Sequence, residues 1–383
     1  MKKAKVVIFQ GGGPISTHNW ILMMMVLELL RLGVRHIYGA RRGVGGIAAW
    51  NVVDLGQLPI DVLLNVAATP GAALRSARDV FTPEVLQMLM AQGVSHVIGI
   101  GGNDTALSIK NIGEAAKIAN YPIVCVHAAK TVDNDLRCCH VTPGYPSAAW
   151  CVAERFTRLD IDTTGMSRVH VAAVMGRLAG FLTGASALGG ADIILLPENW
   201  VVMDDVVAQI ENIYSRRGKC LVAVSEGIRN TRGVLMADVA SSQAENDPHG
   251  NRKLEGGLAV VGYVCEQIKA RLKNVEVRGE TVGYDPRAAK ISAYDQDIST
   301  KIGVEAARFA MEDGHNGSIA VVNKRSTITT AIVPLVEVAG KEKFRVMDQR
   351  FIDKERLHVT DAFINYVRPM IGPLPEFHRF PGE

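Results

Sequence analysis

The sequence lacks an excess of charge of either sign. Its 383 residues include 42 lysines and arginines and 39 aspartates and glutamates, which leaves a formal charge of +3. Proteins that bind nucleic acid or a membrane surface normally carry a concentrated basic excess, so we expect neither partner. Long apolar runs are also missing, because stretches such as 20–27 are far shorter than a membrane span. Residues 1–9 resemble a first strand rather than a signal peptide, and we expect a cytoplasmic protein.

Cysteine is scarce, and six scattered cysteines do not indicate a disulfide framework. One region does contain several potential metal ligands, namely Cys125, His127, Cys138, Cys139 and His140. Their spacing matches no zinc pattern, and adjacent cysteines are awkward ligands for one tetrahedral ion, so zinc is disfavoured. The hydrophobic content of 48% and charged content of 21% are typical of a globular chain. Its length favours two domains.

Three short turns, rich in glycine or charge, each follow a segment that is predicted to form a buried strand. They are GGGP at 11–14 after strand 5–9, GGNDT at 101–105 after strand 96–100, and KTVDND at 130–135 after strand 123–126. Any one of them could be a tight turn without a ligand. Because the carboxyl ends of parallel strands share one edge of a sheet, we expect the three turns to form one crevice.

The chemistry of these turns indicates a site for a phosphate and a metal ion. Glycine loops that lead into helices present backbone N–H groups to phosphate. A carboxylate beside Lys130 suits proton abstraction next to an anion, and Asp104 suits a metal ion that accompanies the phosphate. Arg75 and Arg78, on a short loop, would add cations if that loop reaches the same edge of the sheet.

Strands and helices alternate along the rest of the chain, as in an α/β protein. Further strands are expected at 36–40, 62–66, 169–174, 191–196, 221–224, 275–283 and 318–322. The polar segment 230–257 has no clear period and predicts a long surface excursion. A helix at about 297–313 and the strand at 318–322 are expected to return to the first sheet, and the last sixty residues indicate no chemistry.

Taken in order, these motifs resemble the 6-phosphofructokinase family over most of the chain from Gly11 to Arg287. The matching motifs are the glycine loop, Arg78, GGNDT, KTVDND, Thr142-Pro143-Gly144-Tyr145 with Ser147-Ala148, Arg168, Met175-Gly176-Arg177, Glu226, and Arg278 followed by GYDPR. The resemblance implies two Rossmann-like, three-layer α/β domains with mostly parallel sheets that face a central cleft. Residues 1–145 plus about 290–330 would bind the phosphoryl donor. Residues 146–289 plus the C-terminal segment would bind the sugar phosphate.

The resemblance also implies reversible phosphoryl transfer to the C1 hydroxyl of fructose 6-phosphate, giving fructose 1,6-bisphosphate, with Asp133 as the general base. The catalytic residues would be Asp133, Lys130, Thr131 and Arg177. The donor site would comprise Gly13, Arg78, Gly102, Asn103, Asp104 and Lys130. The sugar site would comprise Thr131, Asp133, Asp135, Arg168, Met175, Gly176, Arg177, Glu226, Arg278, Tyr284 and Arg287. A Mg²⁺ ion would be bound by Asp104, Asn103 and Asp135. The family's oligomers imply a homodimer or homotetramer in which Arg168 reaches a neighbouring sugar site.

Positions 104 and 130 bear on the identity of the donor. Family members that use ATP generally have glycine at both positions, which leaves room for the α-phosphate of the nucleotide. Asp104 and Lys130 would fill that space, and Lys130 would complement the charge of a shorter anion. The chain therefore resembles the pyrophosphate-dependent branch, which would release orthophosphate.

Three departures from the family pattern keep alternatives open. Asn103 stands where many members have an aspartate associated with magnesium, Ser16-Thr17 replaces a usual proline-glycine, and Pro286 replaces a usual glutamine. The donor could instead be ATP, the acceptor could be another ketose phosphate such as sedoheptulose 7-phosphate, or the chain could be a noncatalytic sugar-phosphate-binding subunit. A dinucleotide-dependent oxidoreductase is disfavoured, because the third spaced glycine and the acidic residue after the second strand are missing.

Overall fold

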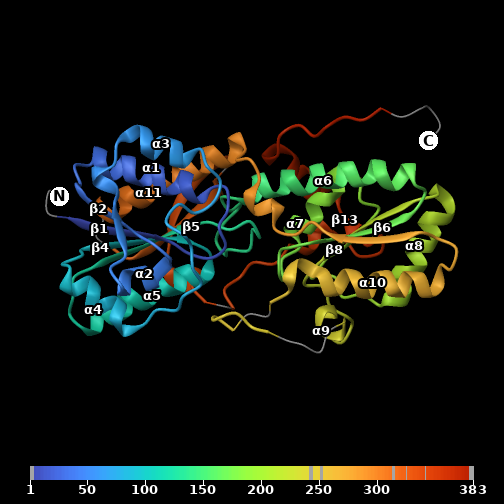
Figure 1. Ribbon diagram of the computed structural model, residues 1–383, viewed down its shortest axis with the longest axis horizontal. Coiled ribbons are helices and arrows are strands. Elements are labelled where there is room, and N and C mark those ends of the chain that lie inside the picture. The colour runs from blue at the N-terminus through green and yellow to red at the C-terminus, as the bar shows by residue number, and fades with distance from the viewer. Residues whose placement is uncertain are drawn as a thin grey trace. The chain divides into compact units, whose positions relative to one another are not determined.

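The computed structural model describes residues 4–240, 245–250, 253–312, 315–324, 326–340 and 342–378. The chain divides into two compact units, each coloured by residue number in Figure 1. The first comprises Met1–Tyr145, Glu245–Arg252 and Arg287–Arg345, and the second comprises Pro146–Ala244, Lys253–Pro286 and Val346–Glu383. No helix in the described part of the chain is long and apolar enough to span a bilayer.

A seven-stranded sheet of order β11-β10-β5-β4-β1-β2-β3 forms the centre of the first unit. Its strands are β1 (Lys5–Gln10), β2 (His36–Ala40), β3 (Val52–Asp54), β4 (His96–Gly101), β5 (Val124–Ala129), β10 (Gly317–Lys324) and β11 (Thr327–Val333). The five inner strands are parallel, whereas β3 and β11 pair antiparallel at the two edges. The inner strands are largely buried, as expected when helices cover both faces of a parallel sheet.

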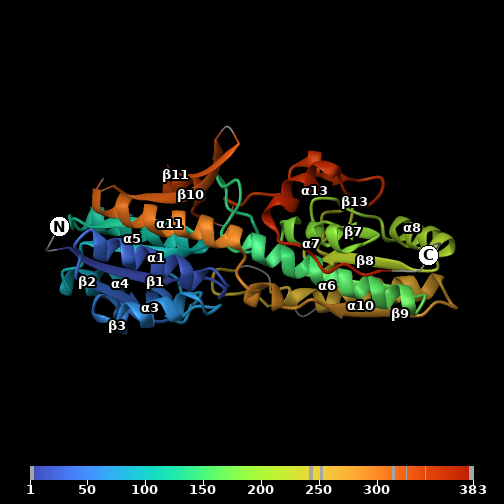
Figure 2. The same ribbon diagram turned by 90° about the horizontal axis from the view of Figure 1, so that it is seen from above.

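Helices cover both faces of this sheet in Figures 1 and 2. On one face α1 (His18–Arg31) packs along α11 (Ala293–Glu312) and against α3 (Ile60–Ala67). The other face carries α2 (Gly43–Ala48), α4 (Pro83–Ala91) and α5 (Asn103–Ile118), with α12 (Leu335–Val338) against α5. The expected return of the late helix and strand to the first sheet is confirmed, because β10 pairs with β5 and α11 packs against β5.

The strand predicted at 62–66 is wrong, because these residues lie inside α3. Leu63 and Ala67, four residues apart, are buried, whereas Val62 and Leu64 are about half exposed. The apolar run therefore buries one stripe at helical spacing, and Pro59 immediately precedes the helix. A short run of apolar residues without a clear period does not by itself distinguish a strand from a helix.

A four-stranded, wholly parallel sheet of order β7-β8-β6-β9 forms the centre of the second unit. Its strands are β6 (Val169–Val174), β7 (Ile193–Leu195), β8 (Cys220–Ser225) and β9 (Val277–Thr281). Helix α6 (Tyr145–Gly165) and helix α10 (Leu258–Arg271) lie on opposite sides of this sheet in Figure 1. Val169, Val171 and Ala173 of β6 pack into the core beneath α8 (Met203–Arg217) and α10.

Shorter elements complete the second unit. They are α7 (Phe181–Ala185), α9 (Met236–Ala240), β12 (Ile352–Asp353), β13 (His358–Val359) and α13 (Asp361–Val367). Helix α9 lies inside the segment predicted as a surface excursion, of which residues 241–244 and 251–252 lie outside the described residues. Both units are α/β with mostly parallel sheets, which confirms the predicted fold class.

Candidate functional site

The three predicted turns meet at Lys130, which follows β5. Its ammonium donates hydrogen bonds to the carbonyl oxygens of Gly11 (3.2 Å) and Gly13 (2.9 Å), after β1. Its backbone N–H donates to the carbonyl oxygen of Gly101 at the end of β4 (3.0 Å). The residue is only 3% exposed. The structure therefore brings the turns together at one edge of the sheet, as the strand order predicts, and we call this group the donor corner.

Glycine is required where the donor corner is most crowded. A Cβ atom on Gly11 would lie 2.2 Å from the hydroxyl oxygen of Thr105, and one on Gly101 would lie 2.1 Å from the same atom. Real Cβ contacts are never this short, so a side chain at either position would displace α5 or the turn. Gly12 also has a φ of 75°, which most residues avoid.

A histidine that the sequence analysis did not assign to the donor site supports the second turn. Nε2 of His127 lies 2.9 Å from the carbonyl oxygen of Gly101, and Nδ1 lies 2.7 Å from the hydroxyl oxygen of Ser318 on β10. Burial lowers the pKa of His127 to about 4, so the ring is neutral near pH 7. Nε2 then donates to the carbonyl and Nδ1 accepts from the hydroxyl, which holds Gly101 in place. A lone histidine on a buried strand carries no sequence signal for this role.

Two arginines add positive charge to the donor corner. The guanidinium carbon of Arg287 lies 3.1 Å from the position of a Cβ on Gly13, and Arg78 pairs with Asp247 at 3.3 Å. Burial, and after it the charge of Arg287, lower the pKa of Lys130 to about 7. The resemblance implied a sugar-site role for Arg287, and that role stays a prediction, since here the residue lies against the glycine loop of the first unit.

Local hydrogen bonds shape the turn that carries Asp133. The backbone N–H of Asp133 donates to the hydroxyl of Thr131 (3.2 Å), and the backbone N–H of Thr142 donates to the side-chain oxygen of Asn134 (3.0 Å). Oδ1 of Asp133 is buried and has no hydrogen-bond partner among the described residues. Buried acceptors without a partner are uncommon in proteins, and each calls for an explanation. The acceptor capacity of this oxygen is therefore unused within the described residues.

The residues predicted to bind magnesium offer few side-chain oxygens for a metal ion. Oδ1 of Asn103 already accepts a hydrogen bond from the backbone N–H of Asp104 (3.1 Å). Within the described residues, no three side chains of His, Cys, Asp or Glu form a group that could hold a metal. Mg²⁺ often binds through one or two carboxylates and completes its octahedron with water and substrate phosphates. Magnesium binding by Asp104, Asn103 and Asp135 therefore stays a prediction, and substrate oxygens and water would have to complete the coordination.

In the second unit, several predicted sugar-site residues lie at the carboxyl edge of the sheet. Glu226, after β8, is 5% exposed, and its Oε1 accepts hydrogen bonds from the backbone N–H groups of Gly176 (3.1 Å) and Arg177 (3.0 Å), after β6. Gly176 and Arg177 have φ values of 141° and 52°. A Cβ on Gly227 would lie 1.7 Å from the carbonyl oxygen of Arg177. The two turns are therefore tightly packed, and Tyr284, after β9, is about half exposed.

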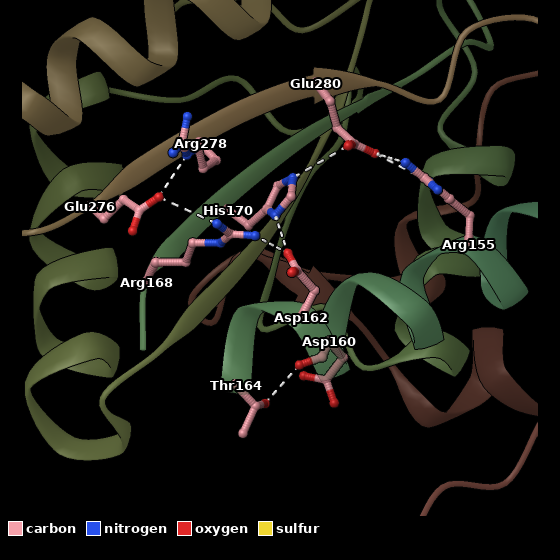
Figure 3. A network of polar contacts seen from close by, with 9 residues as sticks. All are labelled: Arg155, Asp160, Asp162, Thr164, Arg168, His170, Glu276, Arg278 and Glu280. Atoms are coloured by element: carbon pink, nitrogen blue, oxygen red, sulfur yellow. Dashed lines mark hydrogen bonds and ion pairs between the residues drawn. The ribbon is translucent and has the colours of Figure 1, made fainter. Parts of the chain in front are cut away.

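Two other predicted sugar-site residues lie at the opposite edge of the same sheet. Figure 3 shows Arg168, immediately before β6, paired with Asp162 and with Glu276 (3.3 Å). Arg278, on β9, donates to Glu276 (2.6 Å). Both arginines line a cavity of about 400 Å³, and the nearly buried His170 lies between Asp162 (3.8 Å) and Glu280 (3.7 Å). Arg168 and Arg278 therefore lie together, but not with Met175 or Glu226.

Comparison with known proteins extends these observations. A chain from Rhodospirillum rubrum named pyrophosphate–fructose 6-phosphate 1-phosphotransferase is 36% identical, over 99% of this chain and 97% of its own length. A protein from Alkalicoccus urumqiensis named sulfofructose kinase is 28% identical, over 92% of this chain and 93% of its own length.

The fold is also similar to a solved structure. The pyrophosphate-dependent phosphofructokinase of Nitrosospira multiformis superposes with a TM-score of 0.83 at 24% identity, covering 99% of this chain and 94% of that one. The family model described as phosphofructokinase matches residues 5–310, which is most of the chain. On the match to the family model and the similarity to the Rhodospirillum rubrum protein, this chain belongs to the phosphofructokinase family.

Proposed function

We propose that this protein transfers a phosphoryl group reversibly from pyrophosphate to the C1 hydroxyl of fructose 6-phosphate. The observation that carries the proposal is the donor corner, where the buried ammonium of Lys130 reaches the backbone of Gly11 and Gly13. Asp133, three residues further along, has a buried carboxylate oxygen with no partner in the described part of the chain. The name of the Rhodospirillum rubrum relative, pyrophosphate–fructose 6-phosphate 1-phosphotransferase, supports the same reaction.

The position of Lys130 supports pyrophosphate as the donor rather than ATP. Hydrogen bonds from Nζ to two carbonyl oxygens hold the ammonium against the glycine loop, where it takes up space and adds positive charge. Pyrophosphate is short and highly charged, whereas ATP would need room for a further phosphate and a nucleoside. Arg287 and Arg78 add to the same positive potential, which suits an inorganic polyanion.

The chemistry assigns a separate role to each group. Phosphoryl transfer depends mainly on positioning and on neutralising negative charge, so Lys130 and Arg78 bind and orient the donor, and Arg287, predicted for the sugar site, adds positive charge beside the glycine loop. Oδ1 of Asp133 accepts the proton of the C1 hydroxyl, and the carboxylic acid formed in this way returns the proton in the reverse reaction. Thr131 positions Asp133 through its hydroxyl. Mg²⁺, bound through Asp104 and Asp135, would neutralise charge on the donor oxygens.

The arrangement of the second unit supports an oligomer. Arg168 and Met175 lie at opposite ends of β6, which has six residues and therefore spans roughly 20 Å. One hexose phosphate is too short to contact both ends. Met175, Arg177 and Glu226 would bind the sugar in their own subunit, whereas Arg168 and Arg278 would extend into the sugar site of another copy. We propose a homo-oligomer on this basis, with either two or four subunits.

A donor comparison tests the proposed reaction. The purified chain is assayed with Mg²⁺ and fructose 6-phosphate, with either pyrophosphate or ATP, and fructose 1,6-bisphosphate is measured through aldolase. We expect turnover with pyrophosphate and little with ATP. Activity with ATP alone would contradict the size argument at positions 104 and 130, and binding of fructose 6-phosphate without turnover would indicate a noncatalytic subunit. Sulfofructose and sedoheptulose 7-phosphate as acceptors test the choice of sugar.

A further inference from the structure

A second cationic pocket lies on the first unit, beside the segment that leads to Arg78. Its volume is about 530 Å³, and its walls include Arg41, Arg42, Arg75 and Asp79. Arg41 and Arg42 directly follow β2. Arg75 and Asp79 lie on either side of residues 76–78. Three arginines and one carboxylate leave two uncompensated positive charges around one space.

The arginines of this pocket lack protein partners. Within the described residues, the side chains of Arg41, Arg42 and Arg75 make no hydrogen bond or ion pair. The arginine cluster of Figure 3 is different, because Arg155 and Arg278 there are each paired with a glutamate. All three arginines are exposed to solvent, and like charges around one space repel one another, so the cluster favours an anion from solution.

The backbone is specialised to hold these arginines together. Arg42 and Arg75 have φ values of 63° and 59°, in the left-handed region that residues other than glycine seldom adopt. The backbone N–H of Arg42 lies within hydrogen-bond distance of two carbonyl oxygens, those of Leu74 (2.9 Å) and Arg75 (2.7 Å). The two strained residues are therefore fixed side by side by the polypeptide itself.

The pocket is connected to the donor corner through Ser76 and Ala77, which also line it. The hydroxyl of Ser76 donates to the carbonyl oxygen of Gly12. The backbone N–H of Gly12 in turn donates to the carbonyl oxygen of Ala77 (3.1 Å), and Gly11 forms a bridge with Ala77. A ligand that orders this segment would thereby order the glycine loop.

The walls of the pocket define the ligand class. They contain no aromatic or large aliphatic side chain, so a nucleobase or a hydrocarbon chain would find no surface to pack against. Gly45 and Gly46 lie where the wall is crowded, since a Cβ on Gly45 would lie 2.6 Å from Asp79 Oδ2 and one on Gly46 would lie 1.7 Å from the carbonyl oxygen of Arg41. Arginine guanidiniums bind phosphate oxygens in pairs, which suits a small anion with several phosphate oxygens.

We propose that this pocket binds a second inorganic pyrophosphate, and that the bound anion stabilises the glycine loop through Ser76 and Ala77. The identification of pyrophosphate, rather than another small polyphosphate, rests on the proposed function. The pocket adjoins the donor corner through Ser76 and Ala77, but Lys130, Arg287 and Asp133 are not among its lining residues.

Calorimetric titration of the full-length protein with magnesium-free pyrophosphate tests the proposal. Lys130→Met weakens the donor corner by roughly tenfold or more, so binding at pyrophosphate concentrations below the weakened affinity of the donor corner reports on the pocket. We expect this variant to bind about one pyrophosphate per chain. Adding Arg41→Gln, Arg42→Gln and Arg75→Gln should weaken that binding by about tenfold or more. Absence of binding by the Lys130→Met protein, or binding that survives the three further substitutions, would overturn the proposal.

A matched control separates a site from general charge. Arg35→Gln, Arg232→Gln and Arg356→Gln, in the Lys130→Met background, remove the same charge from exposed positions outside the pocket. We expect these changes to leave binding within about twofold of the Lys130→Met protein. An equal loss in both triple variants would contradict the proposal. Single Arg41→Gln and Arg75→Gln variants replace the triple if its circular dichroism shows loss of structure, and each should weaken binding in part.

Hydrogen exchange and turnover complete the test. In the Lys130→Met protein, pyrophosphate should slow backbone exchange at residues 11–13 and 76–77, and the pocket substitutions should abolish this protection. Unchanged exchange there would contradict the link to the glycine loop. Turnover of the wild-type protein with pyrophosphate is measured separately. Turnover without a second binding event would reject the second pyrophosphate site and leave the proposed function intact. Binding at the second site without turnover would reject the proposed function and support the second site.

Discussion

The ammonium of Lys130 lies 2.9 Å from the carbonyl oxygen of Gly13. Lys130 follows β5 and Gly13 follows β1, and β4 runs between these two strands. The hydrogen bond therefore crosses a strand and joins the first and third turns of the donor corner. Because the lysine is buried, its loss should affect both the binding of the donor and the pH dependence of stability.

Lys130→Met should weaken the use of pyrophosphate. The substitution keeps an unbranched side chain but removes the charge and the two hydrogen bonds to the glycine loop. We expect the KM for pyrophosphate to rise by roughly tenfold or more, since hydrogen bonds from charged groups contribute about 1.5–3 kcal/mol each. The KM for fructose 6-phosphate should change much less. Steady-state kinetics at fixed Mg²⁺ measures both, and an unchanged KM for pyrophosphate would contradict the assigned role of Lys130.

Lys130 should also make the unliganded protein more stable as the pH rises above 7. Its folded-state pKa is lowered to about 7 from the ordinary value of 10.5, so between these values the unfolded chain binds more protons than the folded one. The destabilising effect of burying the ammonium is complete below pH 7 and disappears towards pH 10.5. Lys130→Met should therefore stabilise the protein most at pH 6 and least at pH 9.5.

Urea-unfolding midpoints at pH 6, 8 and 9.5 measure this difference in the absence of substrates. Lys301→Met is a suitable control, because Lys301 is partly exposed and pairs with Asp297 on the surface of α11. Parallel pH profiles for wild type and Lys130→Met would show that burial of Lys130 does not determine the pH dependence.

Asp133→Asn should abolish most turnover and leave the fold unchanged. The amide has the same shape as the carboxylate but does not accept a proton, so we expect kcat to fall by roughly 10²–10⁴-fold. The unfolding midpoint should stay close to that of wild type, because Oδ1 makes no hydrogen bond within the described residues. Asp297→Asn on the surface is the control, and turnover near the wild-type rate would remove Asp133 from the mechanism.

Glu226→Ala should weaken binding of the sugar phosphate and reduce stability. Oε1 of Glu226 accepts from the backbone N–H groups of Gly176 and Arg177, which the substitution leaves without this acceptor. The expected loss is about 2–3 kcal/mol in unfolding free energy. The KM for fructose 6-phosphate should rise, with little change for pyrophosphate. Glu226→Gln keeps an acceptor and should have a smaller effect, so equal effects of the two variants would argue against these hydrogen bonds.

Secondary structure was easiest to predict where the pattern extended over a whole strand and its turn. The β-branched runs before Gly11, Gly101 and Lys130 indicated buried parallel strands, because only such strands bury both faces. The apolar run at 62–66 was wrongly predicted as a strand, because a short apolar run is compatible both with a strand and with the buried stripe of a helix such as α3. The antiparallel edge strands β3 and β11 were not predicted, since edge strands lack a continuous apolar pattern.

For individual side chains, too, the sequence determined one part of the site and the tertiary structure decided the rest. Sequence order alone determined that GGGP, GGNDT and KTVDND lie at strand ends, and parallel pairing then places all three at one edge of a sheet. The fold decided which atoms meet: Lys130 with Gly13, His127 with Gly101, and Arg287 with the glycine loop. These contacts join residues 26 to more than 200 positions apart, and their lengths depend on how strands, turns and helices pack in three dimensions. A local sequence pattern carries no information about such packing.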